Sequence, residues 1–384
     1  MGALFPSSAS RLTVRLIMNG LRYRFLKLTG LSARPEALSI EVTHRCIARC
    51  IMCNIWKTPA QVPDLPVGDW LNLLDRPVFR RLKELDVTGG EPFMSEDLPE
   101  LVKGVCALKA TRLRQLKSVA ITTNGFLTDK VLFATRQIVA DMKGAGLDLV
   151  IVFAMDAMGE IHNRIRNVRN GWQKLAETID GMKEMRSTYG NVVIGLKTTI
   201  LPLNVDELDE IARFADHHGL FTIISPCIIT EGRYGNEDLK NSLQFSQEDV
   251  QKMIRFYEGP AFQWSYHRRA LLELLRTGSL HKPCSAGFNY FFIRSTGDVH
   301  ACPLIKKKLG NYKEAAIDEL IASGAARRFR RNIGTFKQCR TCTEPGLERY
   351  ALPFEGLHYL RLLPSLGRKD FLTFHAHMGL DKYI

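Results

Sequence analysis

The sequence has no uninterrupted apolar run of about 18 residues, so it offers no candidate for a helix that crosses a membrane. Its N-terminus also lacks the compact apolar run and small-residue cleavage site of a secretory signal peptide. No nucleic-acid-binding motif is present, and we expect no nucleic-acid partner, although the formal charge of +13 favours anionic partners. Nine cysteines without a secretory signal favour a reducing, cytoplasmic compartment and metal binding over disulfides.

Acidic residues are absent from residues 1–34. Apolar residues recur there at steps of three and four between basic ones, which predicts an amphipathic helix within residues 1–36, although Gly20 weakens it. Such a helix can rest on an anionic membrane surface, or it can pack on the fold and leave its basic face in water. The basic set is Arg11, Arg15, Arg22, Arg24 and Lys27, and the apolar set is Val14, Ile17, Leu21, Phe25 and Leu28.

A chain of 384 residues with 45% apolar content can bury a large core. Between residues 37 and 227, β-rich apolar runs alternate with helical stretches, which predicts an α/β fold with a parallel sheet and right-handed crossovers. The six predicted strands are Ala37–Thr43, Glu84–Thr88, Ser118–Thr123, Leu147–Met155, Val192–Ile200 and Phe221–Pro226. The predicted helices between them are Val67–Asp75, Asp97–Ala110, Thr128–Gly144, Gly171–Tyr189 and Asp206–His218.

Three cysteines follow the first predicted strand at the spacing C-x3-C-x2-C, namely Cys46, Cys50 and Cys53. Three thiolates on one loop can hold three corners of a [4Fe-4S] cluster and leave the fourth iron open to a small molecule. The alternatives are structural zinc with His44 as a fourth ligand, disulfides, or thiols that are merely buried. Zinc sites usually use paired C-x2-C units, which this stretch lacks.

The cysteine spacing, followed about 35 residues later by Gly89-Gly90-Glu91-Pro92, resembles the radical S-adenosylmethionine (SAM) superfamily. The resemblance covers about residues 37–342, and it implies a partial (β/α)6 barrel whose cluster binds SAM through its unique iron. Met52 stands where the family often has an aromatic residue. Active sites of such folds lie at the C-terminal ends of the strands, where the motifs of this chain fall.

The resemblance also implies SAM contacts at the ends of the strands. Gly90 and Glu91 correspond to the strand edge that binds the amino group of the SAM methionine. Asn124, in a T-T-N-G strand ending, is a candidate SAM contact, and Asp156 corresponds to a residue that accepts from the ribose hydroxyls. Ala154 replaces the usual serine near Asp156, which removes one hydroxyl from that contact.

An H-x-x-x-R element follows the fourth strand, and the resemblance assigns its arginine, Arg166, to the carboxylate of SAM. A guanidinium forms a bidentate pair with a carboxylate, which a lysine ammonium does not. We expect Arg164 and Arg169 to be solvated instead. Cys227, just after the sixth strand, either faces the active site or, more commonly for such a residue, is a buried free thiol.

A second cysteine set consists of Cys284, Cys302, Cys339 and Cys342, with a predicted β-hairpin and glycine turn between the first two. Four thiolates can close either an iron–sulfur cluster or a zinc site. Zinc ribbons usually contain C-x2-C twice, and here it occurs once. After a radical SAM barrel, this set looks like a Twitch domain, the shortened relative of the SPASM domain, which implies one auxiliary [4Fe-4S] cluster.

The predicted organisation has five parts. They are a basic amphipathic helix in residues 1–36, a radical SAM barrel in 37–227, a helical linker in 228–283, a Twitch-like β-hairpin and helix domain in 284–345, and an apolar C-terminal tail in 346–384 that packs over the barrel. Ser246 with Glu248 and Asp249 predicts a helix start in the linker, and a second helix is predicted at Ala261–Thr277.

The resemblance implies an enzyme that reductively cleaves SAM to a 5′-deoxyadenosyl radical, which takes hydrogen from a substrate. A peptide, a sugar or cyclitol, and a lipid-linked molecule are all compatible with the sequence. A reductant such as flavodoxin or ferredoxin is implied, and the basic helix suggests peripheral membrane contact. The alternative is a non-catalytic iron–sulfur or zinc scaffold.

Overall fold

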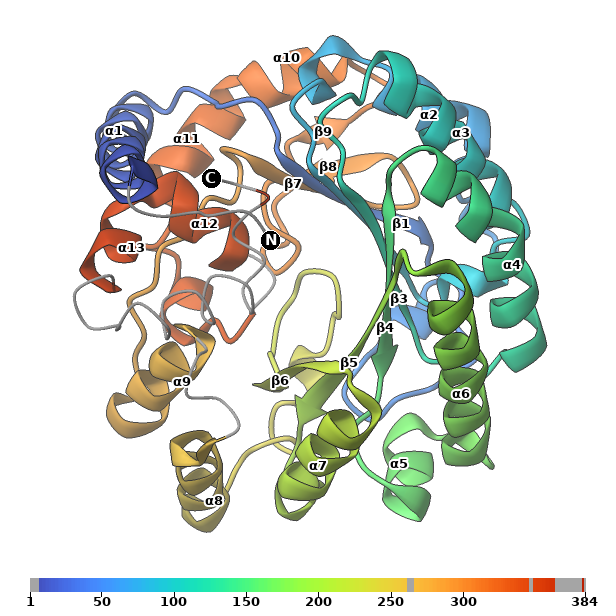
Figure 1. Cartoon of the computed structure of the whole chain (residues 1–384). Coiled ribbons are helices and arrows are strands. Elements are labelled where there is room, and N and C mark those ends of the chain that lie inside the picture. Colours follow the sequence, from blue (N-terminus) through green and yellow to red (C-terminus); the bar gives the residue numbers. More distant parts are fainter. Residues whose placement is uncertain (1–6, 261–265, 345–347, 363–381, 383–384) are drawn as a thin grey trace.

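A computed structural model of the protein describes residues 7–260, 266–344, 348–362 and 382, and Figure 1 shows a curved sheet with helices along its outer side. Six strands run parallel in the order β6-β5-β4-β3-β2-β1. Their bounds are β1 Ala37–Thr43, β2 Glu84–Gly89, β3 Ser118–Thr123, β4 Asp148–Ala154, β5 Val192–Ile200 and β6 Phe221–Pro226. The predicted parallel α/β fold is therefore confirmed.

Helices α2–α7 follow the strands and cover the outer face of the sheet (Figure 1). Because the other face of the strands lines the barrel interior, the strands are buried on both sides. In β1 and β2 apolar residues alternate with polar ones such as Ser39, Glu41 and Asp86. The helices are α2 Val67–Leu74, α3 Leu98–Thr111, α4 Thr128–Gly144, α5 Gly159–Arg166, α6 Gly171–Tyr189 and α7 Leu208–His218. The carboxyl ends of all six strands thus meet at one rim.

The C-terminal hairpin does not form a sheet of its own. Strand β7, Tyr290–Ile293, pairs in parallel with β1, so that Ala37 lies opposite Tyr290. Strands β8, Asp298–His300, and β9, Gly310–Asn311, extend the same sheet in antiparallel fashion, with Gly297 at positive φ in the turn. Helices α10, Ile317–Ala322, and α11, Gly324–Asn332, follow. The second cysteine set is therefore attached to the edge of the barrel itself.

The linker contains helix α8, Gln247–Glu258, and helix α9, Tyr266–Thr277. Ser246 and Asp249 form a capping box at the start of α8, as the sequence predicted: the Ser246 hydroxyl accepts the Asp249 N–H at 3.1 Å, and the Asp249 carboxylate accepts the Ser246 N–H at 2.8 Å. The first residues of the other predicted helix, 261–265, lie outside the described residues.

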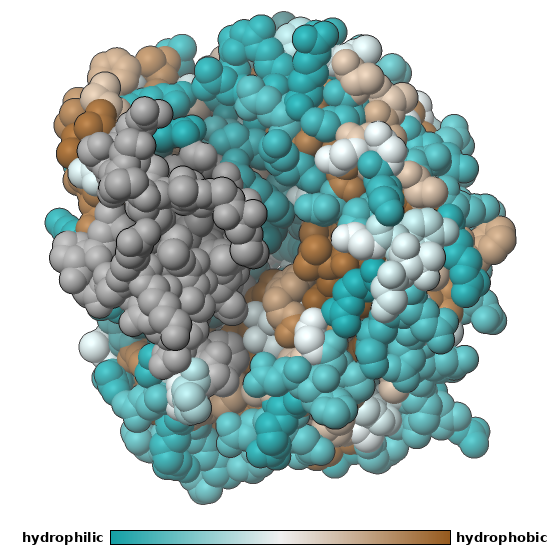
Figure 2. All heavy atoms as spheres, viewed as in Figure 1, coloured by the Kyte–Doolittle hydropathy of each residue, from teal (hydrophilic) through white to brown (hydrophobic). Residues whose placement is uncertain are grey.

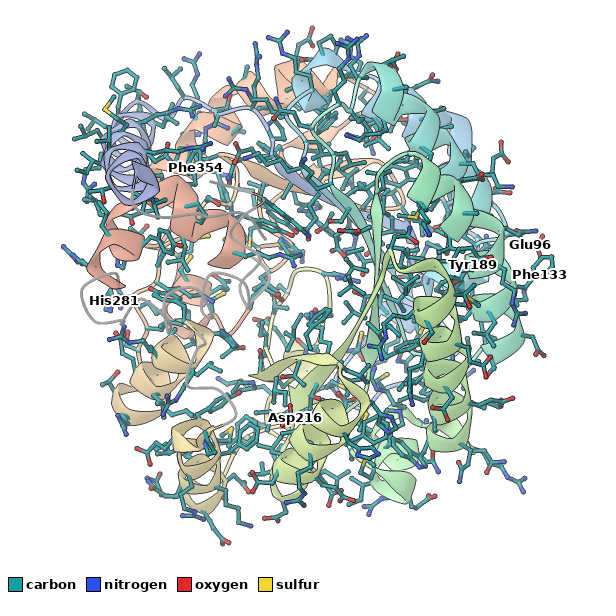
Figure 3. All side chains as sticks on the ribbon, in the orientation of Figure 1. Glu96, Phe133, Tyr189, Asp216, His281 and Phe354 are labelled. Carbon is teal, nitrogen blue, oxygen red and sulfur yellow. The ribbon has the colours of Figure 1, made fainter. Side chains whose placement is uncertain are left out.

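The N-terminal helix α1, Ser7–Thr29, packs against α12, Glu348–Glu355, and α13, Leu357–Leu362. Tyr23 meets Phe354, which is labelled in Figure 3, edge to face at 5.9 Å, and a side chain on Gly20 would collide with Leu357. The tail was expected to pack over the barrel, and its described part contacts both α1 and the barrel: the Tyr350 hydroxyl donates to the Glu84 carboxylate of β2 at 3.1 Å, and the Tyr350 ring stacks on Tyr290 at 5.5 Å. Residues 363–381, including Phe371 and Phe374, lie outside the described residues. In the described part of the chain, no helix has the length and apolar character needed to span a bilayer.

Candidate functional site

The first cysteine loop follows β1 at the rim of the barrel. Cys46, Cys50 and Cys53 line one cavity together with Asn124 and Arg166, and Gly90 borders it as well. Burial raises the pKa of Cys46 to about 12 and that of Cys53 to about 11, and the nearby thiols add to both shifts. Buried thiols that repel one another as thiolates need a positive metal centre to stabilise the charged form.

Backbone and side-chain hydrogen bonds fix the cysteine loop. The N–H groups of Arg49 and Ile51 donate to carbonyl oxygens at the end of α5, at 3.2 and 3.0 Å. The Asn236 amide donates to the Met52 carbonyl at 2.8 Å, and the Trp56 indole donates to the Cys53 carbonyl at 2.9 Å. These bonds attach the loop to the end of α5 and to Asn236 in the segment after β6.

The Glu91 carboxylate joins the loop after β2 to the loop after β3. It is fully buried and accepts from the Thr123 hydroxyl at 2.8 Å, the Asn124 N–H at 2.7 Å and the Phe93 N–H at 3.1 Å. Burial raises the pKa of Glu91 to about 7, even though these three donors lower it. The side chain is thus fully used within the protein, and only the backbone of this turn is left for a ligand.

Arg166 and Asp156 form a buried ion pair, with Nε and Oδ2 2.7 Å apart. The Arg166 Nη1 also donates to the Cys50 sulfur at 3.7 Å, while Asp156 accepts from the Thr199 N–H at 2.8 Å. Burial alone would lower the pKa of Arg166, but Asp156 and Cys50 raise it overall. Asp156 is 0% exposed, and its carboxylate orients Arg166.

His162, four residues before Arg166 on α5, holds the other side of Asp156. Its Nδ1 accepts the Asp156 N–H at 3.2 Å, and its ring meets Phe126 and Trp172 edge to face at 5.7 and 6.3 Å. Burial lowers the pKa of His162 to about 3, and the Arg166 charge contributes to the decrease. The imidazole is therefore neutral at physiological pH and accepts through Nδ1.

We expect acid to destabilise the protein through His162. An unfolded histidine binds a proton near pH 6.5, whereas the folded one does so only near pH 3, so acidification below pH 6.5 favours the unfolded chain. Between pH 7.5 and 5, His162→Asn should lose about 2 kcal/mol less unfolding free energy than the parent. Urea titrations at each pH measure this, and His281→Asn is the matched control because His281 is 85% exposed. Equal pH slopes for His162→Asn and the parent would contradict the assignment.

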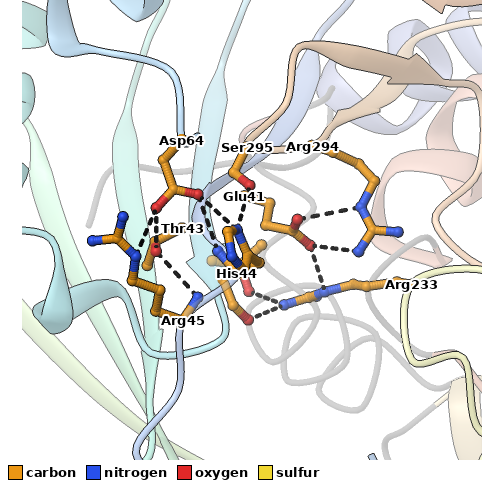
Figure 4. Close-up of polar contacts among 10 residues, drawn as sticks. Glu41, Thr43, His44, Arg45, Asp64, Arg233, Arg294 and Ser295 are labelled. Carbon is orange, nitrogen blue, oxygen red and sulfur yellow. Dashed lines mark hydrogen bonds and ion pairs between the residues drawn. The ribbon is translucent and has the colours of Figure 1, made fainter. Parts of the chain in front are cut away.

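A network of charges supports the ends of β1 and β2 (Figure 4). Glu41 on β1 lies between Arg294 of the C-terminal hairpin, at 3.2 Å, and Arg233 of the loop after β6, at 3.9 Å. Arg233 Nη2 in turn donates to the Thr88 hydroxyl at 2.5 Å and the Gly89 carbonyl at 2.9 Å. The hairpin that follows Cys284 therefore stabilises the rim on which the first cysteine set sits.

His44 is part of this support and not a neighbour of the cysteine sulfurs. Its Nδ1 lies 2.9 Å from the Asp64 carboxylate and 3.4 Å from the Ser295 hydroxyl (Figure 4). Asp64 also accepts from the Thr43 hydroxyl at 2.6 Å, and Thr43 accepts the Arg45 N–H at 3.2 Å. These bonds order the turn that leads from β1 into Cys46, and they leave the His44 ring outside the cavity.

The second cysteine set is brought together as predicted. Cys284, Cys302, Cys339 and Cys342 line one cavity, to which Tyr23 of α1 also contributes. The Tyr23 hydroxyl donates to the Cys284 carbonyl at 3.1 Å. Burial raises the pKa of Cys284 to about 12, and the charges of Cys342 and Cys339 add to the shift. As in the first set, these thiols require a positive centre to be held as thiolates.

Several side chains that the sequence analysis did not single out line the barrel interior. Asp86 on β2, Lys197 on β5 and Arg233 border both the cysteine cavity and the adjoining interior cavity, as does Glu344. Glu344 raises the pKa of Lys197. The signal was present, because Asp86 and Lys197 are charged residues within otherwise apolar strands. Cys227 also lines the cysteine cavity, which favours the first of the two alternatives for this thiol.

Among the described residues, no group of three or more His, Cys, Asp or Glu side chains is arranged to hold a single metal ion. The two thiol sets are instead distributed along the walls of two cavities. Comparison with known proteins identifies what such sets do. A family model described as the radical SAM superfamily matches residues 40–215, and one described as an iron–sulfur cluster-binding domain, SPASM, matches residues 284–343.

The chain belongs to the radical SAM superfamily. The two models together cover more than half of it, and its C-terminal cysteine region is of the SPASM type. Members of this superfamily are radical enzymes. The cofactors of this radical SAM protein are SAM, a [4Fe-4S] cluster that binds SAM, and auxiliary iron–sulfur in the C-terminal region.

Curated relatives of this radical SAM protein are distant. It is 28% identical to a probable GTP 3′,8-cyclase of Methanococcus aeolicus over 42% of this chain and 53% of the relative. It is 21% identical to AlbA, the antilisterial bacteriocin subtilosin biosynthesis protein of Bacillus subtilis, over 72% of this chain and 57% of AlbA. The chain thus spans about half the length of the curated relatives it matches.

Solved structures share the fold. SuiB of Streptococcus suis, bound to SAM, superposes with a TM-score of 0.58 at 16% identity, over 82% of this chain and 72% of SuiB. The enzyme anSMEcpe with bound SAM superposes with a TM-score of 0.56 at 17% identity, over 88% of this chain and 96% of that one. At these identities the similarity establishes the arrangement of the radical SAM barrel and its C-terminal extension.

Proposed function

We propose that this enzyme holds its SAM-binding [4Fe-4S] cluster on Cys46, Cys50 and Cys53 and takes a hydrogen atom from a substrate that lies in the barrel interior. When bound, the reduced cluster supplies the electron that cleaves SAM to methionine and a 5′-deoxyadenosyl radical. One observation carries the proposal. The three buried thiols share a single cavity with Arg166 at the C-terminal rim of a parallel barrel.

The chain's own residues bind and orient SAM. Arg166 borders the cavity and already has two of its nitrogens engaged by Asp156 and Cys50, so its remaining edge can pair with the SAM carboxylate. The Gly90 backbone borders the cavity and would bind the amino group; the position requires glycine, because a Cβ there would collide with the Arg45 carbonyl. Asn124 donates to the Cys46 sulfur at 3.9 Å. Asp156 and Glu91 act as positioning residues behind these contacts.

The substrate would occupy the interior beside Asp86, Lys197 and Arg233. Charges of both signs line that space, which suits a polar group with hydrogen-bond donors and acceptors. A peptide, a sugar or cyclitol, and a lipid-linked molecule each fit this description. AlbA and the SuiB complex with precursor peptide SuiA favour the peptide, because their names and contents point to peptide modification. Further partners would be a one-electron donor such as flavodoxin or ferredoxin, and a membrane surface reached through α1.

Reductive cleavage is tested by incubating anaerobically reconstituted protein with SAM and dithionite under argon. We expect 5′-deoxyadenosine to form in proportion to the amount of protein. Chromatography with mass detection measures it, and protein without dithionite is the control. If no 5′-deoxyadenosine forms while both clusters are present, the chain is a non-catalytic iron–sulfur scaffold.

The auxiliary site is proposed to bind one further [4Fe-4S] cluster through Cys284, Cys302, Cys339 and Cys342. We expect Cys342→Ala to disturb that cluster while substrate-free cleavage of SAM continues at a rate within about threefold of the parent, because the first set lies in a separate cavity. Iron analysis and the 5′-deoxyadenosine assay measure the two effects. Cys106→Ala, on helix α3, is the control. Loss of SAM cleavage in Cys342→Ala with the first cluster intact would mean that the auxiliary cluster supplies its electrons.

A further inference from the structure

Helix α1 has two apolar faces, and only one of them is covered by protein. The covered face contains Leu16, Tyr23 and Leu26, which are at most 8% exposed. Gly20 lies on the same face, where a Cβ would come within 2.9 Å of the Leu357 side chain and 3.0 Å of the Glu355 carbonyl oxygen. The side chain of Asn19 donates to the Pro353 carbonyl at 2.8 Å. The helix is therefore fixed on α12 and α13 in one rotational setting.

The opposite face exposes a row of large apolar side chains, which we call the outer stripe. It comprises Val14, Ile17, Met18, Leu21, Phe25 and Leu28, with exposures of 60, 41, 60, 59, 58 and 80%. The steps of three and four residues keep these side chains on one side of the helix over about 21 Å. Figure 2 shows the matching brown surface at the upper left, where α1 lies in Figure 1. The apolar set that the sequence predicted thus points away from the protein.

Basic side chains border the outer stripe on both sides. At 100° per residue, Arg15 and Arg22 fall on one side of the stripe and Arg24 on the other. All three are exposed, and no acidic residue occurs in the first 34 positions to neutralise them. Arg24 approaches Glu355 only at 3.8 Å, with half of its side chain in solvent. An apolar row with basic side chains on both sides suits a surface that has an apolar interior covered by a layer of anionic groups.

We propose that the outer stripe docks on an anionic phospholipid surface, an inference that specifies the membrane contact in the proposed function and rests on it. The apolar side chains enter the region between headgroups and acyl chains, while the arginines meet the lipid phosphates. A second copy of this chain fits less well, because it would bring the same uncompensated arginines together.

Docking in this way places the auxiliary cysteine set close to the membrane. The inward side of α1 contributes Tyr23 and Lys27, and its flank contributes Arg24, to the cavity that contains Cys284 and the other three thiols. One helix, about 10–12 Å across with its side chains, then separates that cavity from the lipid. The orientation follows from the fixed setting of α1 and needs no rearrangement of the fold.

The test uses the full reconstituted chain and sedimentation with vesicles. The vesicles contain either equal parts of phosphatidylglycerol and phosphatidylcholine or phosphatidylcholine alone. The test variant carries three substitutions, Leu21→Ser, Phe25→Ser and Leu28→Ser. The control is Phe133→Ser, because Phe133 is a 63% exposed residue of α4 on the opposite side of the molecule (Figure 3). We expect the parent and the control to bind the anionic vesicles and to be released by high salt. The triple variant should bind at least about tenfold more weakly.

Three results would overturn the proposal. They are equal binding of the parent and the triple variant, equal binding to anionic and neutral vesicles, and a parent that fails to bind but self-associates through the stripe in analytical ultracentrifugation. The same samples are assayed for 5′-deoxyadenosine with SAM and dithionite. Failure of vesicle binding with normal SAM cleavage contradicts the docking surface alone, whereas failure of SAM cleavage contradicts the proposed function.

Discussion

Replacing Cys46, Cys50 and Cys53 together by alanine is expected to abolish formation of 5′-deoxyadenosine, a loss of at least about a thousandfold. Among the described residues, Cys227 is the one other thiol that lines the SAM cavity, and a single thiol cannot replace three ligands. Single-turnover assays with SAM and dithionite under argon measure the loss. The protein should remain folded, since hydrogen bonds of the loop backbone hold this segment independently of the thiols.

The matched control is Cys227→Ala, which removes a thiol from the same cavity without touching the predicted ligand set. We expect it to keep its first cluster and to cleave SAM in the absence of substrate. If the triple variant still forms 5′-deoxyadenosine, or if Cys227→Ala loses the first cluster, the assignment of the three ligands is wrong.

The second large effect is expected at Arg166. Its guanidinium pairs with Asp156 at 2.7 Å and donates to the Cys50 sulfur, and a lysine ammonium cannot satisfy both partners and still grip a carboxylate through two nitrogens. Arg166→Lys should therefore weaken SAM binding by roughly ten- to hundredfold, the equivalent of about 1.5–3 kcal/mol for lost charge-assisted hydrogen bonds.

Arg164→Lys is the control, because Arg164 lies on the same helix but is exposed. Equilibrium dialysis of SAM against reconstituted protein gives the two dissociation constants, and iron content shows whether the first cluster survives each change. Equal weakening in the two variants would show that the choice of arginine is mistaken. Loss of the cluster in Arg166→Lys alone would assign the residue to the cysteine loop and not to SAM.

The six barrel strands were predictable to within one or two residues because each is buried on both faces and bounded by turn residues. The pairing of β7 with β1 was not, because it joins segments about 250 residues apart and leaves no periodic signal in either one. The hairpin itself could be predicted from its glycine turn. Its place on the barrel edge could not, and that place is what links the two cysteine sets through Arg294 and Glu41.

Some residues of the cavities could likewise be predicted from the sequence, and others could not. The close spacing of Cys46, Cys50 and Cys53 on one loop predicted that they would line the same cavity, because residues a few positions apart on a loop lie close together in space. The ion pair of Asp156 with Arg166, ten residues away and on another element, could not be predicted, because no local pattern records it. The interior charges Asp86 and Lys197 meet only because the sheet curves, which no local pattern records.

We expect this chain to hold two four-iron clusters, one on each cysteine set. Iron and zinc content per chain, measured on anaerobically reconstituted protein, tests this expectation. We expect about eight irons and no stoichiometric zinc. About four irons with one zinc per chain would contradict it, because the second set would then be a structural zinc site and only the SAM cavity would carry a cluster.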